Sequence, residues 1–236
     1  MSKDTLEKII DETINMSYKK KDKLSVRNRY KLMNDGFNKI MKHIDENYQK
    51  EAISYYKKRS LKDKKLNEIQ SEALIEIKNC LKQSLCNKNI EYDIIPASSF
   101  TAKTNLIGES DLDFLILVKK INDDKAICFG NALGNCKYIL SEIRNKKDYK
   151  KKHWVFQKYI NNVEIEGKVR DKDGFKEMLK MHNYTDKMMS SKDKILTTYT
   201  KFLLKESKKY YPKFKMIYYC NAGYHAKAKD LLYPLK

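Results

Sequence analysis

Two aspartates stand one residue apart at the start of a strongly apolar run. Asp111 and Asp113 precede Phe-Leu-Ile-Leu-Val at 114–118. Side chains alternate along a strand, so both aspartates are expected on one face, with the leucines at 115 and 117. Two adjacent carboxylates at the edge of a core repel each other and are costly to desolvate, so a cation has to offset them. Magnesium suits such a pair, because it takes carboxylate oxygens, waters and substrate phosphates as ligands.

The chemistry that such a pair serves is phosphoryl transfer. In a two-metal site, one ion activates the attacking oxygen and the other neutralises the triphosphate. A third carboxylate is expected from a neighbouring strand, where Glu164 and Glu166 share one face and either could serve. Taken alone, these tripeptides are also typical of a solvated strand edge.

The elements that must position these acids form an α+β pattern. Helical periodicity runs from Asp4 to about Lys65, and a further helix is expected from Leu66 to Leu85. Asn161-Asn162 predicts a tight hairpin turn, because Asn tolerates a positive φ. Strands are expected over 89–96 (ended by Pro96), 110–118, 153–160 and 163–170, and helices over 124–143 and from 173 onward, most clearly at 192–207.

This order predicts a mixed β-sheet core with helices packed on it and helical additions at both ends. Three segments follow: a basic helical N-terminal extension (1–65), a core (66–175) and a C-terminal helical lobe (176–236). The net charge of +19 divides among them as +8, +2 and +9. The basic surplus therefore lies in the flanks, although 45 of the 50 basic residues are lysine, as an AT-rich genome would impose.

Basic residues interleaved with tyrosines suit a groove that follows a nucleic-acid strand. A solvated lysine-rich surface is a nearly equal alternative for any one cluster. The same N-terminal helices could recruit a protein partner. The candidate nucleic-acid contacts are Lys19, Lys20, Lys21, Arg27, Arg29, Lys57, Lys58, Arg59, Lys150, Lys151 and Lys152.

The five cysteines are scattered and form no CxxC pair, so reduced, mostly buried thiols and no structural metal are expected. No apolar stretch approaches the roughly 18 residues of a membrane span. The acidic residues near the N-terminus are unlike a secretory or transit peptide. The expected location is intracellular, cytoplasmic or nuclear rather than secreted, with no membrane partner.

The residues before the aspartate pair add a second signal. Ser98-Ser99 ends the first expected strand, an aromatic residue (Phe100) follows, and Thr104 and 108–113 complete the stretch. This stretch resembles the signature of the polymerase-β-like nucleotidyltransferase superfamily, above all archaeal-type CCA-adding enzymes and cyclic-oligonucleotide synthases. The resemblance covers roughly 66–171 by order of elements. Ser98 stands where the family usually has glycine, and the third acid is glutamate rather than aspartate.

The resemblance implies a catalytic role for four acids: Asp111, Asp113, Glu164 and Glu166. The aspartates would bind two magnesium (or manganese) ions, with a glutamate as third ligand. The family's apolar-acid-apolar strand matches Glu164 best, and Glu166 stays an alternative. Ser98 and Ser99 would hold the triphosphate of an NTP, because backbone amides and the serine hydroxyl form an anion nest.

The C-terminal segment resembles the helical lobe of these enzymes, in which a lysine contacts the triphosphate and an aromatic ring stacks on the base. Lys201 and Lys205 lie four residues apart and are candidates for the phosphate. The candidate stacking residues are Tyr199, Tyr218 and Tyr219. Tyrosines at helical spacing are also typical of a core.

Three functions are therefore expected, in this order. The first is a template-independent nucleotidyltransferase that adds NMP from NTP to an RNA 3′ end. The second is a second-messenger synthase of the cyclic-dinucleotide or oligoadenylate kind, with nucleic acid as its activator. The third is a non-catalytic nucleic-acid-binding relative.

Overall fold

A computed structural model describes residues 3–19, 25–83, 90–96, 103–107, 112–141, 154–171, 179–180 and 183–223. The chain divides into two compact units. The helical unit comprises Met1–Arg59 and Glu177–Lys236, and the sheet unit comprises Ser60–Lys176. Most of the two flanking segments expected from the sequence thus belongs to one compact unit, whereas 60–65 belong to the sheet unit. In the described part of the chain, no helix is long and apolar enough to cross a membrane.

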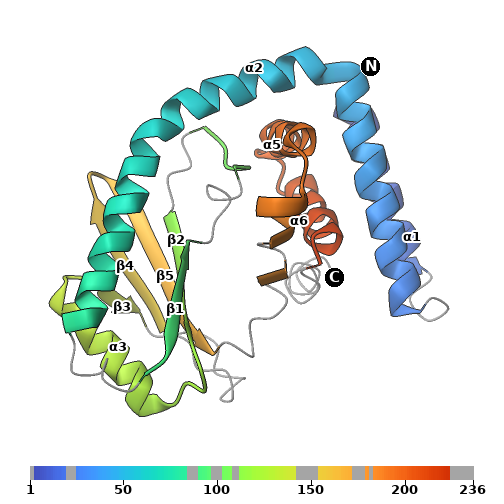
Figure 1. Cartoon of the computed structure of the whole chain (residues 1–236). Coiled ribbons are helices and arrows are strands. Elements are labelled where there is room, and N and C mark those ends of the chain that lie inside the picture. Colours follow the sequence, from blue (N-terminus) through green and yellow to red (C-terminus); the bar gives the residue numbers. More distant parts are fainter. Residues whose placement is uncertain are drawn as a thin grey trace. The chain divides into compact units, whose positions relative to one another are not determined.

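The sheet unit is built on a mixed sheet of five strands with the order β1-β2-β5-β4-β3 (Figure 1). Only β2 and β5 run parallel, and the other neighbours are antiparallel. The α+β prediction is confirmed at this level. The strands are β1 (Tyr92–Pro96), β2 (Leu112–Val118), β3 (Ile139–Ser141), β4 (Trp154–Ile160) and β5 (Val163–Asp171).

One face of the sheet carries the core of this unit. Leu112, Phe114 and Ile116 of β2 point to this face and are at most 1% exposed. The last part of α2 (Val26–Gln83) and α3 (Asp123–Asn135) supply the apolar residues that cover it. Gly167 of β5 is opposite Phe156 of β4, and a Cβ at this glycine would overlap the Phe156 ring. Asp113 of β2 and Glu164 and Glu166 of β5 alternate with these buried residues and therefore lie on the opposite face.

The β4–β5 hairpin has the turn that the sequence predicts. Asn161 and Asn162 have φ of 52° and 64°, in the left-handed region that Asn tolerates. Ile160 pairs directly with Val163, so the turn has two residues. This turn fixes the register of β4 on β5 and hence which residues share a face.

The helix expected over 124–143 is wrong beyond Asn135. Lys137 has φ of 62°, which ends the helix, and the chain then forms β3 against β4. Tyr138 is 3% exposed and packs edge-on against the Phe156 ring, with centroids 5.4 Å apart. A non-local pairing thus overrides the local helical pattern.

The prediction of reduced thiols is also wrong for the sheet unit. Cys80 of α2 and Cys136 at the end of α3 form a disulfide with Cα atoms 6.1 Å apart, and Cys128 is disulfide-bonded as well. A polar contact lies beside this link, because Lys158 of β4 forms an ion pair with Glu76, one helical turn before Cys80. Cys220 remains a buried free thiol, and burial raises its pKa to about 12.

The expected boundary between helices at residues 65 and 66 is absent. α2 continues through it to Gln83, and its only non-helical φ/ψ is at Tyr48 (−138°, 19°). α2 contributes Val26–Arg59 to the helical unit and Ser60–Gln83 to the sheet unit.

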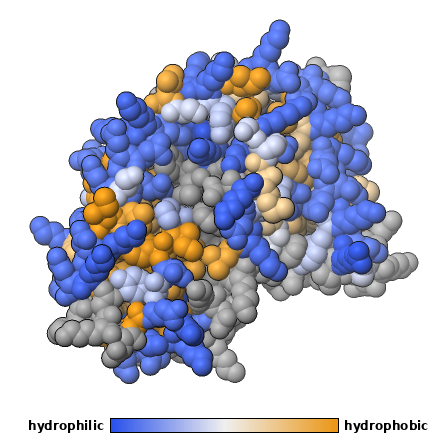
Figure 2. Space-filling view, in the orientation of Figure 1, coloured by the Kyte–Doolittle hydropathy of each residue, from blue (hydrophilic) through white to orange (hydrophobic). Residues whose placement is uncertain are grey.

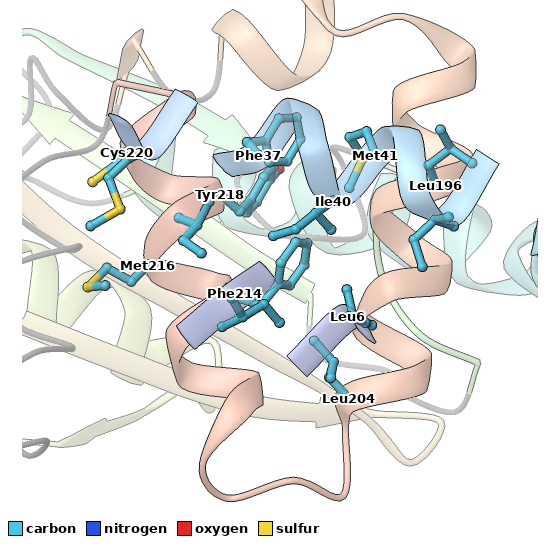
Figure 3. Packing of buried hydrophobic residues seen from close by; sticks show 14 of the residues in the cluster. Leu6, Phe37, Ile40, Met41, Leu196, Leu204, Phe214, Met216, Tyr218 and Cys220 are labelled. Carbon is cyan, nitrogen blue, oxygen red and sulfur yellow. The ribbon is translucent and has the colours of Figure 1, made fainter. Parts of the chain in front are cut away.

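The helical unit has its own apolar core. Leu6, Phe37 and Phe214 meet in it from three different helices, as Figure 3 shows. Its helices are α1 (Lys3–Lys19), the first part of α2, a short π-helical turn η3 (Tyr184–Met188), α5 (Ser191–Leu204) and α6 (Tyr210–Asn221). The predicted helix over 192–207 is confirmed by α5, which Ser190 caps by accepting a hydrogen bond from the Asp193 amide at 3.0 Å.

A partly buried group of polar side chains joins α1 to α6 in this unit, centred on Asp11 of α1. Burial alone would raise the pKa of Asp11, but hydrogen bonds from Lys213, Lys209 and Tyr210 outweigh it and hold that pKa below its usual value. The Lys213 ammonium lies 2.5 Å from the carboxylate. The ionised form of Asp11 therefore stabilises the contact between these helices.

Candidate functional site

The candidate site lies where β2 begins. Asp113 is half-buried, whereas its neighbours Leu112 and Phe114 are buried on the other face. Asp113 occupies the face predicted from the alternation of the strand. Asp111, Ser98 and Ser99 lie outside the described residues, so their roles stay predictions.

The register between the two parallel strands brings a second acid to Asp113. Glu166 of β5 is its Cα partner, and paired residues on neighbouring strands point to the same face. Neighbouring strands lie about 4.8 Å apart, which places the two carboxylates within reach of one cation. This pairing, hereafter the Asp113–Glu166 pair, is the central geometric feature of the site.

Glu164 is on the same face but lies earlier along β5. The first paired residue of β2, Leu112, is opposite Ile165, so Glu164 lies beyond the described start of β2. Its carboxylate accepts a hydrogen bond from the side-chain amide of Gln157 on β4. Of the two glutamates that the sequence left open, Glu166 is the one opposite Asp113.

Gln157 extends the row of polar side chains across the sheet. It is the Cα partner of Glu166 on the side away from β2, so Asp113, Glu166 and Gln157 form one row over three strands. Sequence reasoning did not select Gln157, and only the strand register identifies it.

A lysine lies within the acidic group. The Lys168 ammonium is 2.8 Å from the Glu166 carboxylate, and the two side chains are 35% and 31% exposed. Lys168 follows Glu166 by two residues on β5 and therefore shares its face. Sequence analysis did not select Lys168 either, although the same alternation that selected Glu166 also identifies it.

The carboxylates of Asp113 and Glu166 are suitable ligands for a hard divalent cation. Carboxylate oxygens are what magnesium takes from a protein, and one or two of them suffice when substrate phosphates complete the shell. Among the described residues, no three His, Cys, Asp or Glu side chains are grouped as a metal site. Of the predicted metal ligands, Asp113 and Glu166 are the two that the register places opposite each other, and Asp111 stays a further ligand that the sequence predicts.

The segment just before the site is buried although it is irregular. Thr104, Asn105 and Leu106 are 1%, 2% and 4% exposed. The Asn105 side chain donates a hydrogen bond of 3.3 Å to Asp63 of α2, which is itself 8% exposed. Sequence analysis did not select Asp63, because it stands in a basic helical stretch and its contact with Asn105 spans 42 residues of the sequence.

The C-terminal candidates belong to the helical unit and differ in exposure. Tyr199 and Tyr218 are 8% and 3% exposed and pack in the apolar core, and Tyr219 is partly buried against that core. Lys201 is also buried, with its ammonium 5.3 Å from the Tyr218 ring centre. Lys205 is exposed, and its ammonium lies 3.7 Å from the Glu206 carboxylate. Tyr199 and Tyr218 are thus core residues of the helical unit, which is the alternative that their helical spacing also indicated.

The candidate nucleic-acid residues divide in the same way. Arg27, Lys57 and Lys58 are exposed, and Arg29 is half-buried. Arg59 departs from the expectation, because it is 2% exposed with its guanidinium 4.1 Å from the Tyr56 ring centre. Lys19 ends α1, and Lys20, Lys21 and Lys150–Lys152 lie outside the described residues.

Exposed charged side chains are not confined to these clusters, since Lys119, Lys192 and Glu206 are exposed as well. Hydrophilic residues predominate on the face that Figure 2 displays, although apolar residues interrupt them. The predicted nucleic-acid contacts accordingly stay predictions.

Comparison with protein-family models and with curated protein sequences finds no match for this chain.

Proposed function

We propose that the chain is a metal-dependent, template-independent nucleotidyltransferase that adds NMP from an NTP to the 3′ end of an RNA. The observation that carries the proposal is the Asp113–Glu166 pair, two half-buried carboxylates opposite each other on parallel strands. The signature that precedes β2 in the sequence supports the same reaction class.

The proposed reaction exchanges the phosphoanhydride bond between the α- and β-phosphates of the NTP for a phosphodiester bond to the RNA. The RNA 3′ oxygen attacks the α-phosphorus, the bond from that phosphorus to the bridging oxygen breaks, and pyrophosphate leaves. The hydroxyl proton passes to solvent. Divalent ions would lower the pKa of the attacking hydroxyl and offset the charge on the triphosphate.

The residues of this chain would supply binding and orientation. Asp113 and Glu166 would hold the ions at the start of β2, and Gln157 would keep Glu164 in place beside them. The apolar core behind Asp113 makes the strand a rigid support, because its residues on that face are at most 1% exposed. Ser98 and Ser99 would hold the terminal phosphates, as the sequence predicts.

Incubation of the purified chain with Mg²⁺ and each labelled NTP, with and without a short RNA, tests the proposal. An extended RNA is the expected product. Asp113→Asn should lower turnover by roughly a hundredfold or more, because it removes a metal ligand. Glu91→Gln is the control, since the Glu91 side chain is 74% exposed and forms a surface ion pair with Lys119, outside the site.

Three other outcomes of this experiment would contradict the proposal. A small product made from NTP alone would indicate a second-messenger synthase. RNA binding with steep salt dependence but no turnover would indicate a non-catalytic relative. Turnover that survives Asp113→Asn would rule out the site itself.

A further inference from the structure

A positive charge lies in the row next to the Asp113–Glu166 pair, on the same face of the sheet. The Lys168 ammonium contacts Glu166 at 2.8 Å, and Glu166 is the register partner of Asp113. We infer that Lys168 is the resident counter-ion of the Asp113–Glu166 pair and releases Glu166 when a divalent cation binds. This inference rests on the proposed function, because it concerns the same metal site.

The position of Lys168 on the sheet directs its charge toward the acids. Its own Cα partners are Leu115 of β2 and Val155 of β4, and neither side chain can accept a hydrogen bond. Leu115 is 2% exposed, so an apolar surface adjoins the stem of the lysine. The neighbouring row, which holds Glu166, supplies the carboxylate that the ammonium contacts.

The exposure of the pair is suited to an exchange. A fully buried ion pair cannot give up one partner without leaving a costly unpaired charge. A fully exposed pair contributes little to begin with. Lys168 and Glu166 are each about one third exposed, so the pair orders the carboxylate while water can still take over the released ammonium.

A surface ion pair of the same unit shows the contrast. Lys119 and Glu91 are 3.6 Å apart and 67% and 74% exposed. They lie outside the row of acids, at the end of β2 opposite to Asp113. Removal of the Lys119 charge should therefore leave the metal site unchanged, which makes this lysine a matched control.

Competition for one carboxylate has a definite sign. A bound divalent cation and the Lys168 ammonium compete for the Glu166 carboxylate, and their like charges repel each other. Replacement of the lysine by an uncharged side chain of similar length removes both effects. Metal affinity should then increase. If Lys168 only stabilised the fold, its replacement would leave the metal affinity unchanged or lower it.

Calorimetric titration of Mn²⁺ into the full chain, without nucleotide, measures this directly. We expect Lys168→Met to lower the Kd by about threefold to tenfold relative to the unchanged protein. Lys168→Arg should stay close to the unchanged protein, because it keeps the charge, and Lys119→Met should have no effect. Lys168→Gln serves as a second uncharged variant, and circular dichroism confirms that each variant is folded.

The outcomes separate the inference from the proposed function. If Mn²⁺ binds with equal or lower affinity to both uncharged variants, the role of Lys168 is refuted while the metal site stands. If no variant binds Mn²⁺, or if Asp113→Asn and Glu166→Gln bind it as well as the unchanged protein, the proposed site is refuted and the inference with it.

Discussion

The side-chain amide of Asn105 donates a hydrogen bond to the carboxylate of Asp63, which precedes it by 42 residues, and both side chains are buried. This contact fastens an irregular segment to α2 within the sheet unit. In the sequence, Asn105 stands six residues from Ser99 and six from Asp111. The contact therefore anchors the described residues that stand between these two positions in the sequence.

Asp63→Ala should destabilise this segment. It leaves the buried Asn105 amide without its carboxylate partner, which costs about 1–3 kcal/mol. Chemical denaturation should show the loss, and amide hydrogen exchange should increase at 103–107. The exchanged pair Asp63→Asn with Asn105→Asp should recover most of it, whereas Asp35→Ala, at an exposed position of α2, should change neither measurement. Equal stability of all these proteins would refute the anchoring role.

Removal of the Cys80–Cys136 disulfide should destabilise the sheet unit. The bond closes a loop with a sequence separation of 56, for which the chain-entropy estimate is about 4 kcal/mol. The double variant Cys80→Ala with Cys136→Ala should lower the free energy of unfolding by up to that amount, as measured with urea. Cys220→Ala is the control for loss of a thiol. A double variant as stable as the control would show that the bond does not constrain the fold.

Acidification should destabilise the helical unit through His43. Burial lowers the pKa of His43 from its ordinary 6.5, and the opposing effect of Glu46 is smaller. The Asn47 amide also donates to the ring at 3.3 Å, which requires an unprotonated nitrogen there. The unfolded chain then binds a proton at higher pH than the folded one, so stability falls as the pH drops below about 6.5 toward the folded pKa.

His43→Gln should flatten this part of the profile. Urea denaturation of both proteins between pH 5 and 8 measures the difference, which isolates His43 from the other three histidines of the chain. Parallel profiles for the two proteins would contradict the assignment.

The two glutamates of β5 should differ in their effect on the proposed activity. Glu166→Gln removes the carboxylate opposite Asp113 and should lower turnover by roughly a hundredfold or more. Glu164→Gln keeps a group that can still contact Gln157 and should cost about tenfold or less. Initial rates at saturating NTP and Mg²⁺ give the comparison. The reverse order would identify Glu164 as the ligand.

Much of the local structure followed from the sequence, because it depends on side-chain spacing. Alternation in β2 places Asp113 opposite to the core face, and the paired asparagines at 161–162 form the hairpin turn. The helical periodicity of 192–207 likewise predicted α5. Each of these features is set within a few residues, where periodicity and turn preference act directly.

Local patterns failed where distant segments compete with them. The stretch at 139–141 has a helical pattern but pairs with β4, and the chain turns toward it at Lys137. Arg59 stands in a basic cluster but is buried, with its guanidinium over Tyr56. Burial and pairing depend on surfaces that come together only on folding, and a window of sequence does not contain them.

The acids themselves and their shared faces were determined by the amino-acid sequence alone. The tertiary structure decided that Glu166, rather than Glu164, lies opposite Asp113, and that Lys168 contacts it. It also decided that Cys80 and Cys136 meet. The physical reason is that spacing along one strand sets which side a residue faces, whereas register and cross-links are set by the packing of strands and helices that are distant in the chain.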